Sequence, residues 1–186
     1  MKKSKWLIIL VGALLLIIVC VWIYSSRASS LPINIDPNLY YPVTYVVDGD
    51  TFKAHVDGRD ITVRLLGINT PETVDPRKPV ECYGPEASAE AKSLLIGKKV
   101  ELIFNPDREA HDKYGRYLLF AYRDDGLFVN DFLIREGYAY EYTVGTPYRF
   151  QKQFRDIEKQ AKEAEKGLWG KCSISPSGTS RYLPKL

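Results

Sequence analysis

Apolar residues recur along this chain in three patterns, and each pattern predicts a different kind of element. The first is an uninterrupted apolar run from Trp6 to Tyr24, which contains no charged residue. At about 1.5 Å per residue, a helix over this run nearly crosses a hydrocarbon layer of roughly 30 Å. Trp6, Trp22 and Tyr24 lie near its ends, where aromatic side chains favour the membrane interface. We therefore expect one transmembrane helix, with residues 1–25 forming a cytoplasmic tip and a signal anchor.

The second pattern is a short stretch of β-branched or alternating apolar residues, and it predicts strands. In one such stretch Phe52, Ala54 and Val56 alternate with polar residues, and the following Asp57-Gly58 indicates a hairpin turn. The predicted strands are residues 43–47, 51–56, 61–68, 100–104 and 117–122.

The third pattern places apolar residues three or four positions apart, which predicts helices. One helix begins at Gly84-Pro85, where a proline suits the first turn, and ends at Gly97. Two more are expected over residues 129–136 and 148–166. Strands interrupted by helices indicate an α+β domain. A small barrel of the OB type closes with five strands, although this pattern alone does not separate it from other small α+β folds.

Composition supports one folded domain with extensions at both ends. The 186 residues are 45% hydrophobic and 26% charged, which excludes disorder throughout. Serine, proline and asparagine are frequent in residues 26–41, the predicted linker, and residues 173–186 are expected to form a flexible tail. The folded domain is therefore placed at residues 42–172.

The distribution of charge matters more than the net charge of +3. Residues 1–30 contain four basic residues and no acid, so the rest of the chain is close to neutral. A uniformly basic nucleic-acid-binding surface is excluded, and any anion site must be a local cluster. Three lysines precede the apolar run and Arg27 follows it, so the positive-inside rule places the domain outside the cell.

Two other ways of processing the amino terminus remain open. Cleavage after Ala28 would secrete the domain, although the apolar run is longer than in most cleaved signals. Lipidation at Cys20 is disfavoured by the bulky Val19 before it. The domain is exported in all three cases. The main prediction is an uncleaved single-pass anchor through residues 6–24.

The number of cysteines after the apolar run is consistent with export of the domain. Cys82 and Cys172 are the pair in the exported part, and in an oxidising compartment we expect them to form a disulfide. The alternative is two unpaired thiols. A zinc site is not expected, because two cysteines and two scattered histidines lack ligand spacing.

Three polar clusters interrupt the apolar strands. The first is Asp48-Gly49-Asp50-Thr51, the second is Arg64 followed by Asn69-Thr70-Pro71-Glu72, and the third is Asp112-Lys113-Tyr114-Gly115-Arg116. Carboxylate, amide and carbonyl oxygens suit a hard cation such as Ca²⁺, and paired guanidinium groups suit a phosphate. A carboxylate beside both can orient or deprotonate water. Taken singly, each cluster is most simply a turn or a solvated loop; together they indicate phosphodiester hydrolysis.

The chain resembles the staphylococcal nuclease family between residues 43 and 170. The matching strings are VDGDTF at 47–52, VRLLGINTPET at 63–73, YGPEASAEAK at 83–92, DKYGRYL at 112–118 and EAEKGLW at 163–169. The resemblance implies a five-stranded OB-type barrel with three helices. It also implies a Ca²⁺-dependent nuclease that cuts DNA and RNA and leaves 3′-phosphates.

The resemblance also assigns roles to residues. It implies catalytic roles for Arg64, Glu72 and Arg116, with Glu72 acting on water and the arginines holding the phosphate. It implies metal ligation by Asp50, Asn69 and the Thr70 carbonyl, and substrate contacts from Lys113 and Tyr114. One departure is Asn69, where the type member has an aspartate, and we expect weaker metal binding.

Competing functions remain at this point. The alternative to a membrane-anchored extracellular nuclease is a non-catalytic OB module that binds nucleic acid or protein, and a third is a structural envelope protein. Single-stranded DNA and RNA are the expected partners, and a monomer is the expected state. The tyrosines between 138 and 148 could either stack on bases or serve packing.

Overall fold

The computed structural model describes residues 12–22, 33–174 and 182–184, and the chain divides into two units, residues 1–34 and 35–186. In the first unit, residues 12–22 are helical. No helix within the described ranges is both long and apolar enough to cross a membrane. The remainder of the predicted span Trp6–Tyr24, and Ala28 with its predicted cleavage site, lie outside the described residues.

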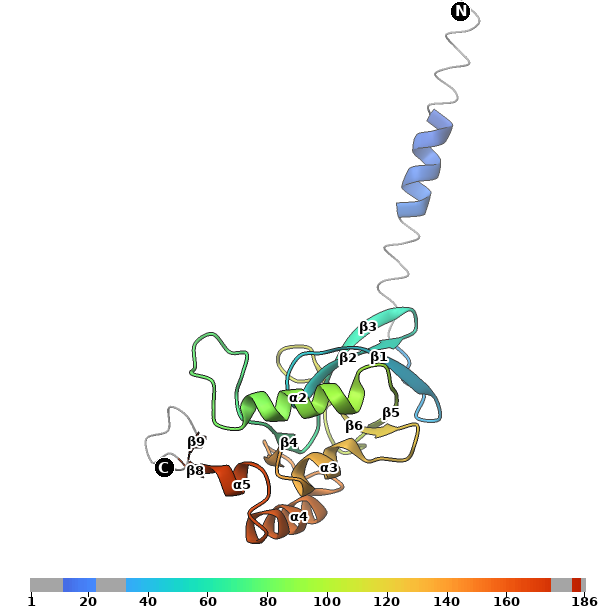
Figure 1. The fold of residues 1–186 in the computed structure, drawn as a ribbon. Coiled ribbons are helices and arrows are strands. Elements are labelled where there is room, and N and C mark those ends of the chain that lie inside the picture. Colours follow the sequence, from blue (N-terminus) through green and yellow to red (C-terminus); the bar gives the residue numbers. More distant parts are fainter. Residues whose placement is uncertain (1–11, 23–32, 175–181, 185–186) are drawn as a thin grey trace, which may run out of the picture. The chain divides into compact units, whose positions relative to one another are not determined.

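The second unit is built on a closed five-stranded barrel, as predicted (Figure 1). Its strands follow the order β1-β2-β3-β6-β5, and only the β3–β6 contact is parallel. The bounds are β1 Tyr40–Val46, β2 Thr51–Val56, β3 Arg59–Leu65, β5 Lys99–Phe104 and β6 Tyr117–Arg123. The alternation in β2 is confirmed, because Phe52, Ala54 and Val56 are fully buried in the barrel.

The predicted strand 61–68 is divided in two by a glycine. Gly67 has φ of +81°, a conformation that side chains disfavour, and it turns the chain out of the barrel. A Cβ on Gly67 would also lie 2.5 Å from the ring of Tyr148. Beyond the turn, β4 (Ile68–Asn69) pairs with β7 (Tyr140–Glu141) instead of continuing in the barrel.

Three helices cover the barrel, as predicted. They are α2 Gly84–Leu95, α3 Val129–Arg135 and α4 Gln151–Glu163, and a short α5 (Leu168–Lys171) follows. α2 packs against β1 and α3, and α3 packs against both β6 and α4 (Figure 1). The small residues Ala87 and Ala91 are buried on α2, which allows this close approach.

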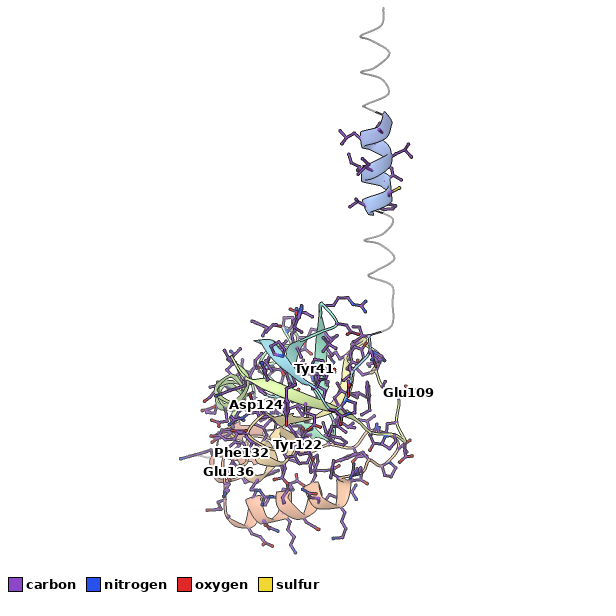
Figure 2. All side chains as sticks on the ribbon, turned by 90° about the vertical axis from the view of Figure 1, so that its right-hand side faces the viewer. Tyr41, Glu109, Tyr122, Asp124, Phe132 and Glu136 are labelled. Carbon is purple, nitrogen blue, oxygen red and sulfur yellow. A yellow bond between two sulfur atoms is a disulfide. The ribbon has the colours of Figure 1, made fainter. Side chains whose placement is uncertain are left out.

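Aromatic side chains join the barrel to α4. The ring of Phe120 in β6 meets those of Phe150 and Phe154 edge to face, with centroids 4.8 and 6.3 Å away. Tyr122 on the same strand, which is labelled in Figure 2, stacks on Phe128 with ring centroids 4.2 Å apart. This cluster fixes the end of β6 relative to the helices.

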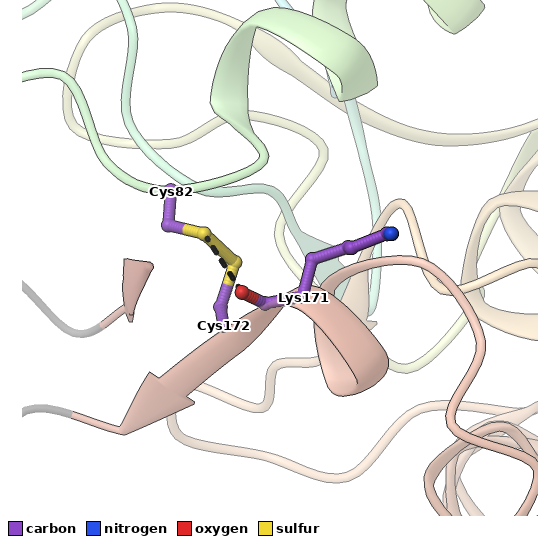
Figure 3. Close-up of a disulfide and its surroundings, with 3 residues drawn as sticks. All are labelled: Cys82, Lys171 and Cys172. Atoms are coloured by element: carbon purple, nitrogen blue, oxygen red, sulfur yellow. Dashed lines mark hydrogen bonds between the residues drawn. A yellow bond between two sulfur atoms is a disulfide. The ribbon is translucent and has the colours of Figure 1, made fainter. Parts of the chain in front are cut away.

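The predicted disulfide between Cys82 and Cys172 is present (Figure 3). Cys172 is buried with Tyr140 and Leu168, so the bond attaches the segment before α2 to the carboxyl-terminal part of the domain. Cys82 Sγ lies 3.8 Å from the carbonyl oxygen of Lys171.

The folded unit extends past both predicted ends. Ile35 and Tyr41 are buried, and the Tyr41 hydroxyl accepts a hydrogen bond from the Asp36 N–H at 2.8 Å, so part of the predicted linker 26–41 belongs to the domain. At the other end β8 (Cys172–Ile174) pairs with β9 (Tyr182–Pro184), two strands that the sequence did not predict in the tail.

Candidate active site

Seven of the eight predicted site residues line one cavity of about 830 Å³. They are Asp50, Arg64, Asn69, Thr70, Glu72, Tyr114 and Arg116. The eighth, Lys113, lines an adjoining cavity of about 740 Å³. The two cavities share Arg64, Tyr114, Arg116 and Tyr142, so they form a continuous recess.

The barrel topology explains why residues far apart in sequence meet here. Thr51 pairs with Arg64 across β2 and β3, which places Asp50 at the end of β3. Arg64 pairs with Leu118 in the parallel contact of β3 and β6, which brings the segment entering β6 to the same edge. That segment carries Arg116. The register of two strand pairs therefore places both arginines and the aspartate at one end of the barrel.

Arg64 is buried, and both terminal nitrogens of its guanidinium group are bonded. Its Nη1 donates to the carbonyl oxygens of Leu65 and Ile68, each at 2.8 Å. Its Nη2 lies 2.6 Å from Asn69 Oδ1 and 3.0 Å from Asp50 Oδ2. The backbone bonds hold the guanidinium plane in place, while Nη2 is directed at the cavity residues.

The three predicted metal ligands lie next to one another. Asp50 Oδ2 accepts hydrogen bonds from the N–H of Thr70 at 2.9 Å and from its hydroxyl at 3.2 Å. The Asn69 amide donates to the Thr70 carbonyl at 3.1 Å and to the Tyr140 hydroxyl. The set offers a carboxylate, an amide oxygen and a carbonyl oxygen, the oxygen chemistry that Ca²⁺ takes. These residues therefore fit a hard cation in donor type.

Acidic charge at this set is low for a calcium site. Nowhere in the described ranges do three or more His, Cys, Asp or Glu side chains form a metal-binding group. Asp48 adds a second carboxylate to the cavity, and its pKa is raised to about 6 by burial first and then by the charge of Asp50. An amide at position 69 adds no negative charge to this set.

Glu72 is held by its own backbone neighbours. Its Oε1 accepts hydrogen bonds from the N–H groups of Thr73, Val74 and Asp75 at 2.9, 2.8 and 3.0 Å. Partial burial raises the pKa of Glu72, but these three donors stabilise the carboxylate more, and its pKa stays below the usual value. Glu72 is therefore ionised at neutral pH.

Arg116 is oriented by a tight turn. Asp112 Oδ2 lies 2.7 Å from both Nε and Nη2 of Arg116, and Asp112 Oδ1 accepts the N–H groups of Tyr114 and Arg116. Burial raises the pKa of Asp112, but its hydrogen bonds with Arg116 and Tyr114 lower the pKa by more than burial raises it. Asp112 therefore remains a carboxylate. Tyr114 is largely exposed, with Arg116 and Lys113 packed over its ring at 5.4 and 5.0 Å.

Sequence reasoning left the tyrosines between 138 and 148 open between base stacking and packing, and it did not single out Glu81. Tyr140 is buried and bonds Asn69, and Tyr142 is exposed and lines both parts of the recess. Tyr148 is buried against Gly67, so of the three tyrosines only Tyr142 has an exposed ring at the recess. Glu81 accepts a hydrogen bond from the Glu72 N–H. The pairing of β4 with β7 was the missing information for Tyr140, and no sequence pattern indicated it.

Comparisons with known proteins point to one family. The family model described as staphylococcal nuclease homologue matches residues 62–171, more than half of the chain. The thermonuclease of Staphylococcus hyicus is 34% identical over 170 residues, covering 91% of this chain and 99% of that protein. The thermonuclease of Staphylococcus intermedius is 38% identical over 129 residues, covering 69% and 75%.

A relative from another genus is similar over two thirds of the chain. Endonuclease YncB of Bacillus subtilis is 40% identical over 128 residues, covering 67% of this chain and 59% of that protein. With the barrel, the cavity and these matches in hand, the chain belongs to the staphylococcal nuclease family.

Proposed function

We propose that this protein is a nuclease that hydrolyses phosphodiester bonds in DNA and RNA, depends on Ca²⁺ and leaves 3′-phosphate ends. The observation that carries the proposal is the convergence of Arg64, Glu72 and Arg116 on one cavity. Two guanidinium groups and an ionised carboxylate are what hydrolysis of a phosphate diester needs from protein side chains. The named nucleases among the relatives support the same reaction class.

Each residue then has a distinct task. Arg64 and Arg116 bind the non-bridging phosphate oxygens and stabilise the charge that builds up in the transition state. Glu72 orients the attacking water and receives its proton; all three backbone bonds go to Oε1, which assigns the proton to Oε2. Lys113 and Tyr114 contact the nucleotide from the adjoining part of the recess.

Asp50, Asn69 and the Thr70 carbonyl would hold the cation. When bound, it would supply positive charge beside the phosphate and help to neutralise the scissile group. A single-stranded substrate suits the recess because Tyr114 and Tyr142 expose rings there on which bases can stack.

We also propose that the domain works outside the cell, attached to the membrane through residues 6–24, and as a monomer. The support is the apolar run, the lysines before it and the disulfide, since disulfides persist in oxidising compartments. Cleavage near Ala28, which would secrete the domain, is the alternative.

The test uses the full chain in detergent and a labelled single-stranded oligonucleotide. We expect fragments with Ca²⁺ and none with EDTA, and phosphatase treatment should shift the mobility of the fragments by removing a 3′-phosphate. DNA that is retarded but intact in both conditions would overturn the proposal in favour of a binding module.

A second arm tests the role of Glu72. Glu72→Gln should lower kcat by about 10²-fold or more, because the amide cannot accept the proton. Glu86→Gln is the matched control, since Glu86 is exposed on α2 away from the cavity. Equal rates for Glu72→Gln and the wild type would remove Glu72 from the chemistry.

A further inference from the structure

The loop that follows Glu72 is closed at its base by two hydrogen bonds. The N–H of Glu72 donates to Glu81 Oε2 at 2.9 Å, and the N–H of Glu81 donates to the Glu72 carbonyl at 2.8 Å. Residues 73–80 lie between these two positions, and most of their side chains are exposed. The closure therefore depends on the Glu81 side chain as well as on the backbone.

This closure bears directly on the Glu72 carboxylate. The three N–H groups that hold Oε1 belong to residues 73–75, the first residues of the loop. They can converge on one oxygen only while the chain leaves Glu72 in its present direction. The hydrogen bond that the Glu72 N–H donates to Glu81 Oε2 fixes that direction at the residue that carries the carboxylate.

The far side of the closure is firmly attached to the domain. Cys82, the residue after Glu81, is disulfide-bonded to Cys172 (Figure 3). Cys172 is buried with Tyr140 and Leu168. Tyr140 in turn bonds Asn69. One end of the loop is thus anchored beside the predicted metal ligands, and the other end carries Glu72.

We propose that Glu81 is a positioning residue that holds Glu72 for catalysis by closing the base of the 73–80 loop, with the adjacent disulfide as its anchor. This inference rests on the proposed nuclease function. Glu81 accepts a hydrogen bond from a backbone group and has no part in proton transfer. Its task therefore requires a side chain long enough to bring an acceptor oxygen to the Glu72 N–H, and it does not require a negative charge.

That requirement gives a conservative variant that separates positioning from charge. Glu81→Gln keeps an acceptor oxygen at the same reach, so it should retain kcat within about twofold. Glu81→Ala removes the acceptor, and kcat should fall on the order of tenfold or more with KM little changed, because misplacing a catalytic group mainly affects the chemical step. Val80→Ala, an exposed neighbour in the same loop, should match the wild type.

A second measurement does not depend on activity. Amide hydrogen exchange on the full chain without metal should be faster at residues 72–75 in Glu81→Ala than in wild type or Glu81→Gln, while exchange in the barrel strands stays the same. Faster exchange throughout would mean that Glu81 only stabilises the fold, and it would overturn the inference.

The outcomes separate the two proposals. A wild-type protein that fails to cut DNA defeats the proposed function, whatever Glu81 does. A wild type that cuts, with Glu72→Gln impaired and Glu81→Ala at full kcat, defeats only the positioning role. Equal loss in Glu81→Gln and Glu81→Ala would also defeat it, since charge would then be the property that matters.

Discussion

Arg64 is bonded by four oxygen atoms, and two of them belong to predicted metal ligands. Its Nη2 group lies between Asp50 Oδ2 and Asn69 Oδ1, at 3.0 and 2.6 Å. The guanidinium thus shares oxygens with the set that would bind a cation, and the charge of that set decides how strongly a cation can compete. Asn69 is the residue at which this balance differs from the type member of the family.

Replacing Asn69 by aspartate tests the balance. Asn69→Asp adds a carboxylate of nearly the same shape, so the affinity for Ca²⁺ should rise about tenfold. Isothermal titration of the full chain with Ca²⁺ measures the dissociation constant. Gln160→Glu adds the same charge on the exposed face of α4 and serves as the control. An unchanged dissociation constant for Asn69→Asp would show that position 69 does not contact the ion.

At this scale, the polar residues of the site could be predicted and their partners could not. Arg64 lies within an apolar strand, Asp50 and Arg116 come directly before strands, and Glu72 lies in the polar segment after β4; none of these charges is needed to form a strand. Tyr140 looks like an ordinary aromatic residue, and its bond to Asn69 joins positions 71 residues apart. Such contacts depend on the pairing of β4 with β7, which local pattern does not reveal.

For the elements too, the spacing of apolar residues predicted where a helix lies, whereas tertiary contacts set where it begins. The helical spacing of apolar residues predicted a helix from 148 to 166, whereas α4 spans Gln151–Glu163. At the start of the helix the reason is the hydroxyl of Tyr148, which lies 3.0 Å from both the Gly67 carbonyl oxygen and Glu141 Oε1 and shares its single proton between these two acceptors. A hydroxyl bonded to the turn after β3 holds residue 148 outside the helix, although its ring fits the apolar stripe.

Tyr148 should make stability depend on pH in the alkaline range. Burial first, and then the charge of Glu141, raise the pKa of the Tyr148 phenol in the folded state. Its contribution is therefore fully present below the unfolded value of about 10 and is lost as pH rises above it. Tyr148→Phe should be less stable than wild type by about 1–2 kcal/mol at pH 8.

The gap should close at higher pH by up to about 1.4 kcal/mol per pH unit above pH 10, since only the wild type must keep that proton. Urea unfolding of both proteins at pH 8, 10 and 11 measures it. A constant gap across this range would show that the phenol titrates alike in the folded and unfolded chains.

On the scale of the whole molecule, the disulfide is the one long-range covalent link among the described residues. It joins positions 90 apart in sequence and connects the segment before α2 with the carboxyl-terminal strand β8. The cysteine count and the expectation of export were sufficient to predict it. Its neighbours Tyr140 and Leu168 were not predictable, because burial there arises from how α5 packs.

Removal of this link should cost a large part of the stability of the domain. Closing a loop of this length restricts the unfolded chain, and the model of chain entropy gives about 4–5 kcal/mol. Cys82→Ala combined with Cys172→Ala should lower the free energy of unfolding by up to that amount. Alanine suits the buried position 172 better than serine, which would leave a hydroxyl without a partner.

Reduction provides the matched control, in a Cys20→Ser background that excludes bonds between molecules. Dithiothreitol should destabilise the parent protein in urea unfolding nearly as much as the double substitution does, and it should leave the double variant unchanged. If reduction and substitution both change the free energy of unfolding by less than about 1 kcal/mol, the bond does not restrict the unfolded chain. Its role would then be to anchor the loop that follows Glu72.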